Sequence, residues 1–107
     1  MPDRVHAITT RNILLALAGA VILAACGAPP GDAENGRRWY AMHNCSACHG
    51  QNANDGRARA IAGLDMGFTR FEGILREPYS PSMPPFPEAI LSRQDAADIY
   101  AWLKSRK

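Results

Sequence analysis

The sequence Cys45-Ser46-Ala47-Cys48-His49 places two cysteines three positions apart and follows them directly with a histidine. This C-x-x-C-H spacing is typical of covalent haem attachment. Two thiols at this separation can form thioethers with the vinyl groups along one edge of a porphyrin. The next side chain is then held close enough for an imidazole nitrogen to bind the iron. We therefore predict haem c on Cys45 and Cys48, with His49 as the proximal ligand.

Two other interpretations of the motif have less support in the residues around it. A redox-active C-x-x-C of the thioredoxin type requires a βαβ context, and no strand pattern surrounds this motif. A structural zinc site needs four ligands. The only other cysteine is Cys26, which has a different explanation.

The first part of this 107-residue chain is typical of a targeting segment, which leaves room for one small domain. Arg4 and Arg11 form a basic region ahead of the uncharged, largely apolar run Ile13–Ala25. That run is too short to span a bilayer comfortably and suits the h-region of a signal peptide. It ends in Leu23-Ala24-Ala25-Cys26, which resembles the cleavage box of bacterial lipoproteins.

The resulting expectation is a lipoprotein-type signal peptide over residues 1–25 and a lipidated Cys26. One alternative is an ordinary signal peptide in which Cys26 occurs by chance. Another is an uncleaved N-terminal anchor. Residues 26–31 then form a short linker, and residues 32–107 form the haem domain. Five extended residues reach less than roughly 18 Å, so we expect the domain to sit against the periplasmic side of a bacterial membrane. The formal net charge of +2 gives no indication of nucleic acid binding.

Three segments have the periodicity and capping residues of helices, which predicts an all-α fold. They run from Asp32 to about Asn44, from Thr69 to just before Pro78, and from Ser92 to Arg106. Asp32 and Ser92 can cap their helices, and Thr69-x-x-Glu72 matches a capping box. Gly36 can permit close approach of another helix, and we expect that partner to be the last helix.

A proline-rich segment follows the second helix. Residues 79–87 contain four prolines, which predicts a stiff, extended loop. Met83 lies inside it, and a thioether sulfur suits haem iron as the partner of histidine. Met66 is a second candidate without a comparable rigid frame, and the absence of any methionine ligand is a third possibility. Met42 lies on the helical turn that leads to Cys45, so it cannot reach the opposite face of a haem.

Basic side chains near the motif are candidates for pairing with haem propionates. They are Arg57, Arg59 and Arg70, although an arginine at such a position is more often a solvated surface charge. The small apolar segment Ile61–Leu64 is expected to pack on the proximal side of the haem.

These elements, in this order over about residues 32–105, resemble a class I c-type cytochrome. The features that carry the resemblance are the Gly36 and Tyr40 pair, the C-x-x-C-H motif, the segment Met83-Pro84-Pro85-Phe86, and the segment 99–103. The resemblance implies a cytochrome c fold, with three main helices around one covalently bound haem. Many members have a proline where this chain has Arg59, and the proline carbonyl accepts a hydrogen bond from the proximal histidine. Because every residue has a carbonyl, that bond to His49 can persist here.

The function that the resemblance implies is electron transfer, not enzyme catalysis, and the expected lipidation of Cys26 makes the carrier membrane-tethered. With His49 and Met83 in both axial positions, no site remains for a small-molecule substrate. The implied partners are a dehydrogenase, a bc1-type complex or a terminal oxidase. One alternative is a haem subunit held permanently by one dehydrogenase or reductase. Another is a haem enzyme or gas sensor with a missing or labile methionine ligand.

Overall fold

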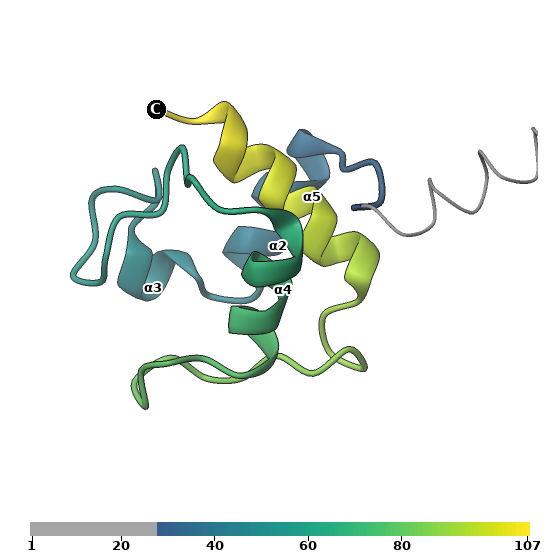
Figure 1. Cartoon of the computed structure of the whole chain (residues 1–107). Coiled ribbons are helices and arrows are strands. Elements are labelled where there is room, and N and C mark those ends of the chain that lie inside the picture. The colour runs from purple at the N-terminus through teal and green to yellow at the C-terminus, as the bar shows by residue number, and fades with distance from the viewer. Residues whose placement is uncertain (1–27) are drawn as a thin grey trace, which may run out of the picture.

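The computed structural model describes residues 28–107, and within this range the chain forms helices and no strands (Figure 1). The helices are α2 (Ala33–Met42), α3 (Ser46–His49), α4 (Phe68–Arg76) and α5 (Arg93–Ser105). The predicted all-α class is confirmed. None of the helices in this part of the chain is long and apolar enough to cross a membrane. The predicted signal peptide and Cys26 lie outside the described residues.

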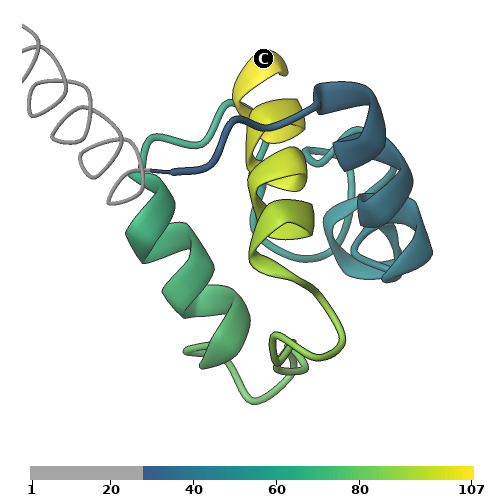
Figure 2. The same cartoon turned by 90° about the vertical axis from the view of Figure 1, so that its right-hand side faces the viewer.

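The two terminal helices of the domain, α2 and α5, pack directly on one another, and α5 lies between α4 and α2 (Figure 2). Gly36 is buried at the contact, and a Cβ atom there would collide with the backbone of Asp98. Beside it, the rings of Tyr40 and Trp102 lie 4.7 Å apart between centroids. The predicted pairing of the first and last helices is therefore confirmed, and glycine is what permits the close approach.

A buried carboxylate fixes the start of α2 on α5. Asp98 is 4% exposed, and its oxygens accept hydrogen bonds from the backbone N–H of Asp32 at 2.8 Å and from the indole N–H of Trp39 at 3.2 Å. Gln94 donates to the same carboxylate at 3.0 Å and to the carbonyl of Pro30 at 2.7 Å. The end of the predicted linker is thus held against the helical domain.

Two of the three predicted helix caps are present. The side chain of Asp32 accepts a hydrogen bond from the N–H of Asn35 at 2.9 Å. The hydroxyl of Ser92 accepts one from the N–H of Asp95 at 3.0 Å. Both bonds satisfy N–H groups that a helix start leaves without a partner.

The prediction that Thr69 opens the middle helix through a capping box is wrong. The helix begins one residue earlier, at Phe68, and its N-cap is Gly67, which makes no side-chain capping bond. Phe68, the first residue of the helix, is buried. The carboxylate of Glu72, the expected capping partner, instead pairs with Arg76 one turn later at 2.9 Å.

Long loops connect these helices and surround the candidate site. Residues 50–67 form turns between α3 and α4, and residues 77–91 contain no α-helix, as the proline content predicts. The apolar core is built mainly from α4 and α5, with Tyr40 added from α2. Residues of both loops, Ala53, Leu64 and Leu91, also belong to this core, so the loops pack on the three longer helices.

Candidate functional site

The C-x-x-C-H segment forms a helix of its own. Helix α2 ends at Met42, and Asn44 has a φ of 59°, a left-handed conformation that asparagine tolerates better than most residues. The chain turns there and enters the four-residue helix α3. The N–H of His49 bonds to the carbonyl of Cys45 at 2.9 Å, so these two residues lie one helical turn apart on the same face.

The end of the motif is fixed to α2. Gly50, with a φ of 88°, follows His49, and a Cβ atom at this position would collide with Asp55 and Gly56. The hydroxyl of Tyr40 donates to the carbonyl of Gly50 at 2.6 Å. Burial raises the pKa of Tyr40 to about 12, so this hydroxyl keeps its proton at neutral pH.

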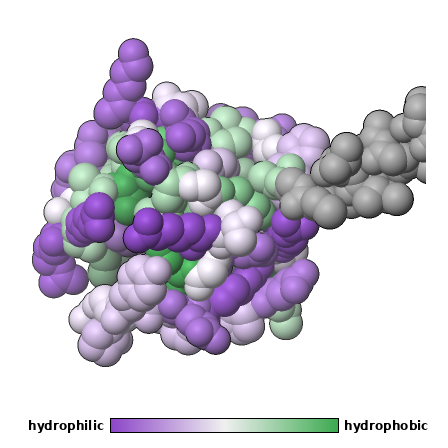
Figure 3. Space-filling view, in the orientation of Figure 1, coloured by the Kyte–Doolittle hydropathy of each residue, from purple (hydrophilic) through white to green (hydrophobic). Residues whose placement is uncertain are grey.

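Two cavities meet beside the motif. One has a volume of about 310 Å³ and the other about 600 Å³. The residues that line both are Cys45, His49, Arg59, Ser80 and Met83. Apolar side chains from α4 and α5, including Phe71, Leu75 and Ile99, form much of the wall of the smaller cavity. In the view of Figure 3, hydrophobic residues lie between hydrophilic ones on the surface that faces the viewer.

The histidine of the motif is oriented by one hydrogen bond. Its Nδ1 lies 2.8 Å from the carbonyl oxygen of Arg59. A carbonyl only accepts, so Nδ1 must carry the proton and the lone pair of the neutral ring is on Nε2. This tautomer is the one that binds a metal through Nε2. Arg59 thus supplies the carbonyl that a proline supplies in many class I cytochromes.

The two cysteines of the motif differ in environment. Neither forms a disulfide; Cys45 is partly buried, and Cys48 is exposed and lines only the larger cavity. Burial raises the pKa of the Cys45 thiol to about 11. Within residues 28–107 no three His, Cys, Asp or Glu side chains gather as they would around a structural zinc ion.

The three candidate methionines occupy different places. Met83 lines both cavities, whereas Met66 lines only the smaller one. Met42 is 65% exposed and lines neither. The methionine of the proline-rich loop is therefore the one that shares both cavities with His49.

Two of the three candidate arginines reach the site. Arg59 lines both cavities and Arg70 lines the smaller one. Arg57 is exposed and lines neither. Arg59 and Arg70 could each pair with a carboxylate at the edge of the apolar cavity. The propionates of a haem are carboxylates of this kind.

Some cavity residues were not predicted from the sequence. His43 and Phe86 both line the larger cavity, and their rings meet edge to face with centroids 5.8 Å apart. Tyr79 lines the smaller cavity while its side chain remains 79% exposed. The only signal for these residues is their position directly beside the motif or within the methionine loop.

The donor set and the cavities together fit a haem. Apolar walls suit the porphyrin, a neutral imidazole has its lone pair free, and a thioether lines the same cavities. Two thiols at the C-x-x-C spacing lie at the same site. These residues would hold the group between the motif and the methionine loop.

Comparison with known proteins gives the family. Residues 31–103 match the family model described as "Cytochrome C oxidase, cbb3-type, subunit III". No curated protein and no solved structure matches the chain. A c-type cytochrome domain implies haem c binding and an electron-transfer role in place of catalysis. Because the match covers most of the chain, the protein belongs to this family of c-type cytochromes.

Proposed function

We propose that the protein is a membrane-tethered carrier of single electrons, with one haem c attached to Cys45 and Cys48. His49 and Met83 are the proposed axial ligands. The observation that carries the proposal is that these two side chains line the same pair of cavities, with Nε2 of His49 left free for a metal. When bound, the haem supplies a one-electron couple between ferric and ferrous iron.

The protein's own residues set the properties of such a centre. The Arg59 carbonyl keeps the imidazole in one tautomer and orientation, which also makes it a better donor. A thioether ligand from Met83 would raise the reduction potential relative to a second imidazole. Buried apolar side chains such as Phe71 and Leu75 keep water away from the cavity.

Electron exchange is proposed to occur at the exposed side of the site. Cys48 is exposed and lines the larger cavity, so a haem edge attached there would lie near the surface. Partner proteins of the proposed carrier are a periplasmic or membrane dehydrogenase, a bc1-type complex or a terminal oxidase. With two axial ligands in place, the iron would have no open position for a small-molecule substrate.

A second candidate is a haem subunit held in one complex. The family description names a subunit of an oxidase, which favours this alternative over a freely diffusing carrier. Co-purification with a larger oxidoreductase in a fixed ratio would support the subunit. Recovery of the haem protein alone under mild detergent extraction would support the carrier.

Replacement of the proposed methionine ligand tests the site directly. Met83→Ala should lower the reduction potential, remove the ferric absorption band of sulfur ligation, and let carbon monoxide bind the ferrous form. Met42→Ala is the matched control, because that side chain lines neither cavity, and it should leave all three properties unchanged. An unchanged band in Met83→Ala would exclude Met83, and loss of the band in Met66→Ala would identify the alternative ligand.

The proposed tether is tested at Cys26, the first residue of the predicted segment 26–31. Cys26→Ser should move the protein from the membrane fraction to the soluble periplasmic fraction, because serine cannot carry the thioether-linked lipid. The fraction is measured by cell fractionation and haem staining. Persistence of Cys26→Ser at the membrane would refute lipid attachment at this residue.

A further inference from the structure

The loop of residues 77–92 carries Met83, and its return limb, residues 84–92, is tied to α4. Three residues after Met83, the N–H of Phe86 donates to the carbonyl of Leu75 at 2.7 Å. Leu75 is a buried residue of α4 whose side chain lines the smaller cavity. The loop that carries the methionine is therefore anchored to the helix that forms the cavity wall.

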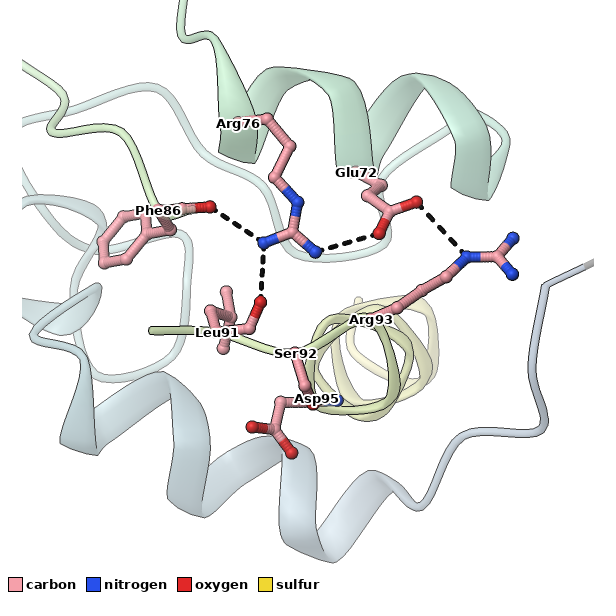
Figure 4. A network of polar contacts seen from close by, with 7 residues as sticks. All are labelled: Glu72, Arg76, Phe86, Leu91, Ser92, Arg93 and Asp95. Carbon is pink, nitrogen blue, oxygen red and sulfur yellow. Dashed lines mark hydrogen bonds and ion pairs between the residues drawn. The ribbon is translucent and has the colours of Figure 1, made fainter. Parts of the chain in front are cut away.

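One side chain reinforces this anchor at two further points. A single guanidinium nitrogen of Arg76, the last residue of α4, donates to the carbonyl of Phe86 at 2.8 Å and to that of Leu91 at 2.6 Å (Figure 4). Phe86 and Leu91 both lie in the limb, residues 84–92, that connects the methionine to α5. The side chain thus fastens two points of that limb with one group.

A carboxylate holds the guanidinium in place. Glu72, one turn earlier on α4, accepts from the second terminal nitrogen of Arg76 at 2.9 Å and from Arg93 of α5 at 3.4 Å. The side chains of Glu72 and Arg76 are each 21% exposed. Charge-assisted hydrogen bonds in such a partly buried position are stronger than ion pairs at the surface. The planar guanidinium can donate to the two carbonyls and to the carboxylate at the same time.

We propose that Arg76 is a positioning residue for Met83, which it holds opposite His49 by clamping the return limb of the loop to α4. This inference rests on the proposed ligation by Met83. Arg76 itself does not line either cavity, so it acts on the ligand only through the backbone of the loop. Without the Arg76 side chain, only one of the three hydrogen bonds between the limb and α4 remains, the one from Phe86 to Leu75. The thioether of Met83 would then dissociate from the iron more often.

Competition by free imidazole measures how firmly the methionine is held. Imidazole binds ferric iron only when the sulfur has left, so its apparent affinity rises as the loop loosens. For the haem-loaded protein we expect Arg76→Gln to bind imidazole about tenfold more tightly than wild type, which corresponds to about 1.4 kcal/mol. Arg76→Lys keeps the positive charge but not the planar guanidinium. Its affinity for imidazole should lie between that of the wild type and that of Arg76→Gln.

A control separates positioning from general loss of stability. Asp98→Asn weakens the hydrogen bonds at the α2–α5 contact and touches no residue of the methionine loop. It should lower the melting temperature yet leave the imidazole affinity within about twofold of wild type. If Arg76→Gln changes the affinity no more than Asp98→Asn does, the clamp does not position Met83. Should Arg76→Gln fail to fold, Arg76→Lys decides, and an unchanged affinity in that variant overturns the inference.

The same samples distinguish this inference from the proposed function. A sulfur-ligation band in the wild type that disappears in Met83→Ala establishes the ligand, whatever the Arg76 variants do. With that band present, unaltered imidazole binding in the Arg76 variants would refute the clamp alone. A wild type without the band would overturn the ligand and the clamp together.

Discussion

At the level of single residues, one hydroxyl connects the first helix to the haem motif. Tyr40 donates to the carbonyl of Gly50 at 2.6 Å, while its ring packs on Trp102. Tyr40→Phe keeps the ring and removes the bond, and the Gly50 carbonyl retains a second donor in the N–H of Ala53. We expect the free energy of unfolding to fall by about 0.5–1.5 kcal/mol, measured by urea denaturation of the haem-loaded protein.

A control for loss of a hydroxyl is Thr69→Val. Thr69 is exposed on α4 and lines neither cavity, so loss of its hydroxyl should leave the free energy of unfolding unchanged. Equal stabilities for Tyr40→Phe and wild type would mean that the bond to Gly50 contributes nothing to holding the motif.

Site residues differ in how far the sequence reveals them. Cys45, Cys48 and His49 are set by a local spacing, so the motif can be recognised without knowledge of the fold. The carbonyl of Arg59 as partner of His49 could also be anticipated, because it follows from a family position and not from side-chain identity. The role of Arg76 could not, because its carbonyl partners are ten and fifteen residues away and meet it only after the loop returns to α4.

At the level of elements, the contact of α2 with α5 depends on the absence of a side chain at Gly36. Gly36→Ala would improve helix propensity by about 1 kcal/mol, but its Cβ would collide with the backbone at Asp98. Overpacking against a rigid backbone costs about 1–3 kcal/mol, so we expect a net loss of stability and a lower melting temperature.

A second helical glycine provides the comparison. Gly73 is exposed on α4, and a Cβ atom there would meet no other atom within 4 Å. Gly73→Ala should therefore stabilise the protein by about 1 kcal/mol through helix propensity alone. The free energy of unfolding should therefore rise in Gly73→Ala and fall in Gly36→Ala. Stabilisation by Gly36→Ala would contradict the close approach of α2 and α5.

Helix ends show why local patterns predict some elements and not others. The caps at Asp32 and Ser92 depend only on residues within one turn, and both are present. Thr69-x-x-Glu72 has the same pattern, yet α4 starts one residue earlier, and Glu72 pairs with Arg76 and Arg93 in place of a backbone N–H at the helix start. The partners of the buried Asp98 could not be predicted from the sequence either, since they belong to α2 and its N-cap, about sixty residues away along the chain.

At the level of the whole molecule, residues 28–107 surround cavities of about 310 Å³ and about 600 Å³ beside a small core. Domains of this size are marginal when a hydrophobic core alone must stabilise them. Burial of a few hundred Å² of porphyrin would contribute on the order of 10 kcal/mol before any opposing cost. We therefore predict that the haem-free protein is poorly folded, as judged by its NMR spectrum. Well-dispersed amide signals without haem would contradict this.

The central claim is that one haem c is bound by His49 and Met83, and the absorption spectrum of the purified protein tests it most directly. Spectra are recorded for the oxidised protein, for the reduced protein, and for the reduced protein in the presence of carbon monoxide. The proposed ligation predicts a ferric band of sulfur ligation and no shift with carbon monoxide. A missing sulfur band together with a large carbon monoxide shift would contradict it, and an accessible iron would then favour a haem enzyme or gas sensor.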